Sequence, residues 1–120
     1  MFANGEPAMA YGTMGGEGQP QTQAAVVTRV VDFGYDVQRA VEAPRWLYGR
    51  TWGQASAALS LEASFPSTVV DRLAAMGHDV QTVPAWSGTM GHAQAISIDR
   101  ERGVYWAAAD PRSDGAAAGW

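Results

Sequence analysis

Apolar residues recur at helical spacing in the stretch that follows Pro20. The positions that make up this stripe are Ala24, Val27, Val30 and Val31. Proline is favoured in the first turn of a helix, and Gly34 is a typical residue just beyond a helix end. The pattern therefore predicts a helix over residues 20–33.

Two shorter helices are predicted further along the chain. Asp36 is a suitable N-cap and Pro44 disfavours helical backbone at the preceding residue, so the first of them spans residues 36–43. Pro66 opens the second and Gly77 ends it. The apolar stripe of this last helix consists of Val69, Val70, Leu73 and Met76.

Alternating or continuous apolar runs predict the strands. The expected extended segments are residues 8–14, 45–50, 55–62, 79–83, 93–99 and 104–109. The last two flank a four-residue turn and form a hairpin, whereas residues 1–7 are expected to be a frayed lead-in and residues 86–91 a loop. This order of elements predicts an α+β fold in which helices pack on an antiparallel sheet.

The junction between the first strand and the first helix is the strongest candidate for chemistry. Gly15 and Gly16 are adjacent there. Glycine permits positive φ and close approach of the backbone to a ligand. Two free amides ahead of a helix are suited to hold a developing negative charge. A tight turn with no ligand is the alternative interpretation of such a pair.

Composition excludes several kinds of chemistry. The chain has no Cys and no Lys, which rules out thiolate nucleophiles, Cys-ligated zinc, Schiff-base lysines and P-loops. A net charge of −4 argues against nucleic acid, and no apolar run reaches the roughly 20 residues of a membrane span. The N-terminal segment lacks the basic region of a secretion signal. The absence of Cys fits cytoplasm and periplasm alike, with the cytoplasm slightly preferred.

A series of short motifs resembles the C-terminal part of gamma-glutamyltransferase, a family of N-terminal-nucleophile hydrolases. In chain order the motifs are Gly-Thr-Met-Gly-Gly at 12–16, Gln-Pro-Gln at 19–21, Asp-Phe-Gly-Tyr-Asp-Val-Gln at 32–38, Ala-Pro-Arg at 43–45, Ala-Met-Gly-His at 75–78, Gly-His-Ala-Gln-Ala-Ile at 91–96 and Asp-Pro-Arg-Ser-Asp-Gly at 110–115. The resemblance covers nearly the whole chain. It implies that residues 1–120 are a single domain, a C-terminal fragment that forms part of a four-layer α-β-β-α sandwich.

The resemblance also implies a division of chemical roles. In the family a Thr at the N-terminus of the small subunit attacks the substrate, and the pair matching Gly15 and Gly16 donates amides to the oxyanion. The Thr-Thr-His type of motif that begins with this nucleophile does not occur here. The chain is therefore expected to be inactive alone and to pair with the missing N-terminal or large-subunit polypeptide, or to self-associate as a homo-oligomer. The complete enzyme would act on a small gamma-glutamyl or acyl substrate without a cofactor. The alternative is a stand-alone, non-catalytic binding or assembly module that retained the fold.

Several other polar residues are predicted to have structural roles. His78 and His92 belong to different predicted elements and are expected to be structural or solvated, since no further zinc ligands stand at suitable spacing. Asp110, Arg112 and Asp114 are expected to form an internal salt-bridged corner. The alternative for Arg112 is bidentate binding of a substrate carboxylate.

Two further predictions concern Glu17 and the tryptophans. Glu17 follows the glycine pair and is expected to be a solvated loop acid, with contact to a substrate amine as the alternative. The chain is rich in tryptophan for its length, and these residues are expected in the core or in an interface. They are Trp46, Trp52, Trp86, Trp106 and Trp120.

Overall fold

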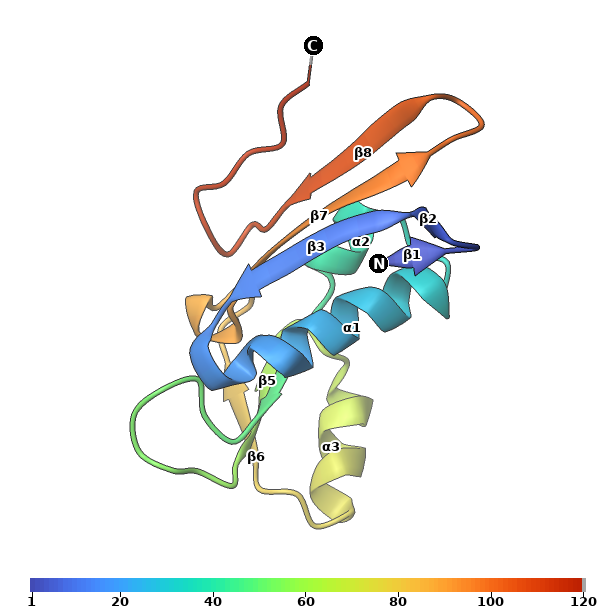
Figure 1. The fold of residues 1–120 in the computed structure, drawn as a ribbon. Coiled ribbons are helices and arrows are strands. Elements are labelled where there is room, and N and C mark those ends of the chain that lie inside the picture. The colour runs from blue at the N-terminus through green and yellow to red at the C-terminus, as the bar shows by residue number, and fades with distance from the viewer. Residues whose placement is uncertain (120) are drawn as a thin grey trace.

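The computed structural model describes residues 1–119, which form an α+β fold with three small sheets (Figure 1). The strands are β1 (Phe2–Ala3), β2 (Glu6–Pro7), β3 (Met9–Met14), β4 (Trp46–Tyr48), β5 (Leu59–Glu62), β6 (Val80–Val83), β7 (His92–Asp99) and β8 (Val104–Ala109). The helices are α1 (Gln19–Val31), α2 (Val37–Glu42) and α3 (Ser67–Ala75), with the short 3₁₀ turns η1 (Gly16–Gly18) and η2 (Gly88–Met90). Each predicted helix and strand has a counterpart, in most cases a shorter one.

The larger sheet has the order β3-β7-β8 and is antiparallel throughout. Met9 pairs with Ser97 across β3 and β7, and Asp99 pairs with Val104 at the start of the β7–β8 hairpin. Helices α1 and α2 lie on one face of this sheet (Figure 1). The core between the helices and the sheet consists of Met9, Val26, Val37, Ala40, Val41, Ala93, Ala95 and Ala108.

Strand β7 illustrates how the sequence produces this layer. Ala93 and Ala95 point to the helices and are each 2% exposed, while the alternate residues Gln94 and Ile96 are exposed on the opposite face. This is the period of two that places alternate side chains on opposite faces of a strand. Because the inward positions are small, α2 packs closely against β7 and β8.

The second sheet, β4-β5-β6, departs from the predicted antiparallel arrangement. Strand β4 is antiparallel to β5, but β5 and β6 are parallel. The reason is that α3 lies between them in the chain and returns it to the same end of the sheet, as parallel neighbours require. None of the residues of α3 is buried. Its predicted apolar stripe is therefore only partly covered, and Met76 is 67% exposed.

The first seven residues form a hairpin, so the predicted frayed lead-in is wrong. Phe2 pairs with Pro7 and Ala3 pairs with Glu6. Asn4 and Gly5 connect the strands with φ values of 52° and 83°. Asn-Gly is the preferred pair for a two-residue turn in which both residues have positive φ, and this was the local signal available in the sequence.

Within residues 1–119, none of the helices combines the length and the apolar character required to cross a membrane.

Candidate functional site: the di-glycine junction

The di-glycine junction lies where β3 ends and η1 begins. Gly15 has φ 150° and ψ 26°, and Gly16 has φ 52°. Both values fall in the region of positive φ that side chains disfavour, so the sharp turn depends on glycine. The Gly18 amide donates to the Gly15 carbonyl oxygen at 2.9 Å, which closes η1, and Pro20 then lies in the first turn of α1.

The amides of Gly15 and Gly16 are the atoms of interest. Across residues 1–119, neither amide donates a hydrogen bond to another group of the protein. Gly15 is buried, whereas Gly16 is exposed. A buried backbone donor normally has a partner, so an amide without one is a notable feature. The pair is thus available to an incoming acceptor.

A loop from the beginning of the second sheet encloses the junction from one side. The Glu17 amide donates to the Thr51 carbonyl oxygen at 3.0 Å. The Glu17 carboxylate accepts two hydrogen bonds from Arg50, at 2.8 and 2.9 Å. Trp52 lies beside Gly16, where its ring carbon Cε3 would be 2.9 Å from a Cβ on the glycine.

Glu17, predicted to be a solvated loop acid, lies at this side of the junction. It is 61% exposed, as a solvated acid would be, but it is paired with Arg50. The hydrogen bond from Arg50 lowers the pKa of Glu17 below its ordinary value of 4.5. The same contact raises the pKa of Arg50. The carboxylate is thus held in its charged form at the rim of the junction.

On its other side the junction meets the start of β7. The two Thr-Met-Gly segments of the chain, 13–15 and 89–91, end here against each other. A Cβ on Gly15 would lie 3.1 Å from the Gly91 Cα, and a Cβ on Gly91 would overlap the Met14 carbonyl oxygen. The two backbones approach this closely only because both positions are glycine.

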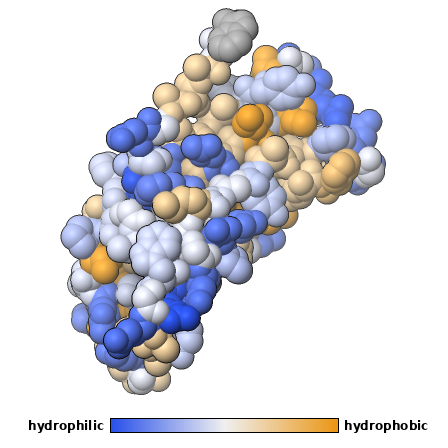
Figure 2. Space-filling view, turned by 60° about the vertical axis from the view of Figure 1, so that its left-hand side comes forward, coloured by the Kyte–Doolittle hydropathy of each residue, from blue (hydrophilic) through white to orange (hydrophobic). Residues whose placement is uncertain are grey.

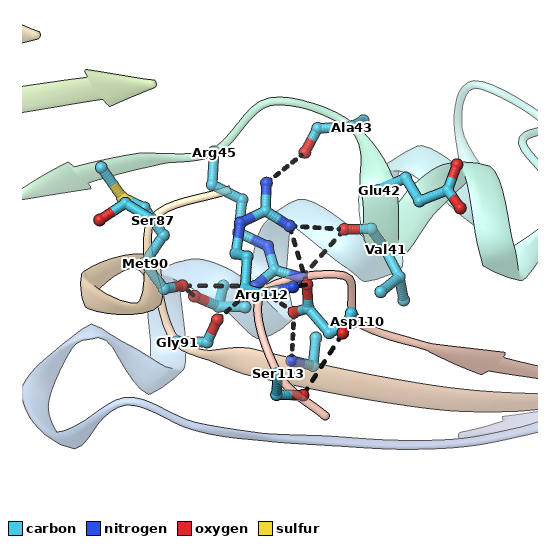
Figure 3. Close-up of polar contacts among 12 residues, drawn as sticks. Val41, Glu42, Ala43, Arg45, Ser87, Met90, Gly91, Asp110, Arg112 and Ser113 are labelled. Atoms are coloured by element: carbon cyan, nitrogen blue, oxygen red, sulfur yellow. Dashed lines mark hydrogen bonds and ion pairs between the residues drawn. The ribbon is translucent and has the colours of Figure 1, made fainter. Parts of the chain in front are cut away.

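Behind the junction lies a buried cluster of four charged side chains, which we call the interior quartet. Its members are Arg45, Glu62, Asp110 and Arg112. Arg112 contacts Glu62 at 2.5 Å and Asp110 at 3.0 Å, and Arg45 contacts Asp110 at 2.6 Å. Figure 3 shows both guanidinium groups directed at Asp110. All four side chains are at most 1% exposed.

The quartet also organises backbone groups around it. Arg45 donates to the carbonyl oxygens of Gly91 at 2.8 Å and Val41 at 3.0 Å (Figure 3). Asp110 accepts from the Ala93 amide at 2.6 Å, and Glu62 accepts from the Ser87 amide at 3.0 Å. Buried charges are tolerated when they are paired and hydrogen-bonded in this manner.

Burial affects the two arginines differently. Desolvation, together with the nearby charge of Arg112, lowers the pKa of Arg45 to about 10. Burial alone would lower the pKa of Arg112 as well. The hydrogen bonds and charge interactions of Arg112 with Glu62 and Asp110 outweigh the effect of burial, so the pKa of Arg112 is raised. Both remain cations at neutral pH.

The predicted internal corner is confirmed in part. Asp110 and Arg112 form it, and the donor groups of Arg112 are directed at internal carboxylates and carbonyls. Asp114 is exposed and makes no ion pair within the described part of the chain. Sequence reasoning missed Glu62 and noted Arg45 only within a motif. A charged residue ending the apolar strand β5 was the available signal for Glu62.

The remaining predictions have mixed outcomes. Asp36 caps α2 as predicted, accepting from the Arg39 amide at 2.8 Å. His78 is exposed and His92 is half-buried. Among residues 1–119, no three His, Asp or Glu side chains converge in a way that could hold a metal ion.

The tryptophans are not core residues. Those within the described residues are between 39% and 58% exposed, which makes the core prediction wrong and leaves the interface prediction standing. They are Trp46, Trp52, Trp86 and Trp106. Trp120 lies outside the described residues.

Similarity to known proteins agrees with the motifs. The family model for gamma-glutamyltranspeptidase matches residues 1–120. Oxamate amidohydrolase proenzyme of Klebsiella pneumoniae is 51% identical over 112 residues, which are 93% of this chain and 21% of that protein. Glutathione hydrolase-like YwrD proenzyme of Bacillus subtilis is 47% identical over 115 residues, 96% of this chain and 22% of that protein.

The structural comparison agrees with the sequence comparison. The crystal structure of cephalosporin acylase from Bacillus halodurans superposes with a TM-score of 0.84 at 35% identity, covering 98% of this chain and 21% of that one. The chain spans about a fifth of the length of the curated relatives it matches, within their C-terminal region. The expected fold, part of an N-terminal-nucleophile hydrolase, is confirmed. The chain belongs to the gamma-glutamyltranspeptidase family.

Proposed function

We propose that this chain is the C-terminal segment of a gamma-glutamyltransferase-like acyl hydrolase or transferase, and that it contributes the Gly15 and Gly16 amides to the oxyanion hole. The nucleophilic Thr hydroxyl comes from the rest of the polypeptide. When that hydroxyl attacks the carbonyl carbon of the substrate, its proton passes to the amino group of the same Thr, and the carbonyl oxygen becomes negative. The two amides stabilise this oxygen. The isolated chain, without the nucleophile, is inactive.

The observation that carries the proposal is the state of the two amides. The two amides belong to adjacent residues, and within residues 1–119 neither has a hydrogen-bond acceptor. Preorganised donors of this kind act where charge develops in the transition state. The surrounding atoms oppose collapse of the turn, because Gly91 lies against Gly15 and the Thr51 carbonyl lies against Gly16.

The outer face of the larger sheet indicates a partner. Away from the helices, this face carries Ala10, Ile96, Tyr105 and Ala107, and Ile96 and Tyr105 are 44% and 75% exposed. Figure 2 shows apolar residues gathered toward the end of the molecule that bears the C-terminus. Exposed apolar faces of this kind usually belong to an interface. We assign this face to the remainder of the polypeptide, with self-association when that part is absent.

Light scattering coupled to size exclusion tests the partner assignment. The purified chain is expected to elute as a dimer or larger species, and to bind the remainder of the polypeptide when the two are co-expressed. A stable monomer that does not bind the remainder would contradict it.

A chimera tests the chemistry. Residues 1–120 would replace the matched region of the Klebsiella pneumoniae proenzyme, which is similar enough for such an exchange. The chimera is expected to cleave itself and to release ammonia from oxamate, with gamma-glutamyl p-nitroanilide assayed in parallel. The isolated chain is expected to turn over neither compound. Turnover by the isolated chain would contradict its proposed inactivity.

A pair of glycine variants in the chimera tests the oxyanion role. In Gly16→Ala the new Cβ would overlap the Thr51 carbonyl oxygen and displace the amide, so kcat should fall about 10²–10³-fold. Gly12→Ala is the control, because no atom of residues 1–119 lies within 4 Å of a Cβ there. Self-cleavage on gels reports assembly separately. A self-cleaved Gly16→Ala chimera with full activity would rule out the oxyanion role.

A further inference from the structure

The turn that lies against the di-glycine junction is held by a side chain at each of three consecutive carbonyls. The Thr51 hydroxyl donates to the Thr89 carbonyl at 2.7 Å, and the Thr22 hydroxyl donates to the Met90 carbonyl at 3.1 Å. The Gly91 carbonyl accepts from Arg45, as described above. These donors come from α1, from the residue that precedes β4 and from the loop that follows β4. Residues 89–91 are thus fixed from three separate parts of the fold.

Among these donors, Thr51 also contacts the junction itself. Its carbonyl oxygen accepts the Glu17 amide at 3.0 Å and lies where a Cβ on Gly16 would overlap it. Its hydroxyl reaches the opposite side, to Thr89. Thr51 is 6% exposed, although its neighbour Arg50 is only half-buried and its neighbour Trp52 is exposed. One buried residue therefore connects both walls of the junction.

The consequence is mechanical. The Thr51 carbonyl accepts the Glu17 amide and lies against Gly16, and the side-chain hydroxyl of the same residue is bonded to Thr89. Without the hydroxyl bond, the loop carrying Thr51 would lose its tie to Thr89. It would still contact the junction through the Glu17 amide, which donates to the Thr51 carbonyl, and through the exposed Glu17–Arg50 pair. A displacement of the amides by a fraction of an ångström weakens a preorganised oxyanion hole.

We infer that Thr51 is a positioning residue that holds the Gly15 and Gly16 amides in place through its hydroxyl bond to Thr89. The inference rests on the proposed oxyanion function of the two glycines. Thr51 touches no reacting atom. Its effect is expected on the chemical step and not on substrate binding.

Two substitutions isolate the hydroxyl. Thr51→Val keeps the shape of the side chain and removes the donor, whereas Thr51→Ser keeps the donor. In the self-cleaved chimera, Thr51→Val should lower kcat about tenfold with KM within about twofold, and Thr51→Ser should restore most of kcat. Thr28→Val is the matched control, because within the described residues the Thr28 hydroxyl bonds only to carbonyls of its own helix.

A second readout does not depend on turnover. In the ¹⁵N-labelled isolated chain, Thr51→Val should shift the amide resonances of Gly15 and Gly16, and Thr28→Val should leave them in place. This measurement decides the inference even where the valine variant fails to self-cleave. Unchanged glycine resonances would overturn it.

The kinetic outcomes separate the inference from the proposed function. If Gly16→Ala abolishes turnover while Thr51→Val behaves as the parent chimera, the role of Thr51 is wrong and the oxyanion role stands. If neither substitution affects kcat, the oxyanion role itself fails. A change confined to KM in Thr51→Val would also overturn the positioning role.

Discussion

Two groups of arginine–carboxylate contacts lie on either side of the di-glycine junction, in opposite environments. The side chains of the interior quartet behind the junction are at most 1% exposed, whereas those of Glu17 and Arg50 at its rim are 61% and 35% exposed. Both use the same chemical groups at similar distances. Their contributions to the fold are nevertheless expected to differ greatly, because water competes only at the rim.

The difference indicates a division between a rigid support and an adjustable rim. The quartet joins β5, the segment after β8 and the start of β7, and its charges cannot separate without leaving an unpaired ion in the interior. The rim pair can open at little cost to the fold. The candidate amides thus lie between a fixed base and a loop whose ionic contact depends on pH.

The largest expected effect is on the quartet. Arg112→Met would leave Glu62 buried without its ion-pair partner and Asp110 paired with Arg45 alone, and the free energy of unfolding should fall by about 3–5 kcal/mol. Urea unfolding followed by tryptophan fluorescence measures this loss. Arg102→Met, which removes an arginine that is 73% exposed, is the control and should change stability far less. Equal losses in both variants would remove the distinction between interior and surface.

The next effect concerns the close approach of the two Thr-Met-Gly segments. Gly91→Ala places a Cβ against the Met14 carbonyl at a φ of 79°. Gly34→Ala is the matched control, since the φ of Gly34 is 66° and, in the described part of the chain, nothing lies within 4 Å of the new Cβ. The control should lose about 1–2 kcal/mol from left-handed backbone alone, and Gly91→Ala should lose more. If thermal and urea unfolding give the same loss of stability for both variants, the overlap of the new Cβ with the Met14 carbonyl adds nothing to the cost of left-handed backbone.

A smaller effect is expected at Thr22, which supports the same turn from α1. Thr22→Val removes the donor to the Met90 carbonyl and should cost about 1 kcal/mol, because Arg45 still reaches that oxygen at 3.4 Å. Thr28→Val on the exposed side of α1 should be close to neutral. If Thr22→Val leaves the free energy of unfolding unchanged in urea unfolding, Arg45 alone is sufficient to stabilise the turn at Met90.

The smallest effect belongs to the rim and depends on pH. Since the folded-state pKa of Glu17 lies below its ordinary 4.5, its stabilising contribution is present above pH 4.5 and is lost as pH falls through the folded-state value. Glu17→Gln should therefore reduce the acid dependence of the melting temperature. A carboxyl NMR titration of Glu17 gives its pKa directly. A measured pKa of Glu17 at or above 4.5 would contradict its pairing with Arg50.

Local patterns predicted much of the framework. The stripe after Pro20, the cap at Asp36 and the hairpin of β7 and β8 all follow from periodicity and capping, which act over a few residues. The parallel pairing of β5 and β6 was not predicted, because strand direction depends on how α3 packs. The Asn4-Gly5 turn carried a local signal that was overlooked.

The sequence by itself determined where most of the helices and strands lie, placed a glycine pair between a strand and a helix, and identified the family through its motifs. Only the tertiary structure decided what surrounds that pair. Arg112 and Glu62 are 50 residues apart in the chain, and Thr51 reaches Thr89 across 38 residues. Such contacts form because folding removes water from these groups and requires each to find a partner. No local pattern specifies which distant partner that is.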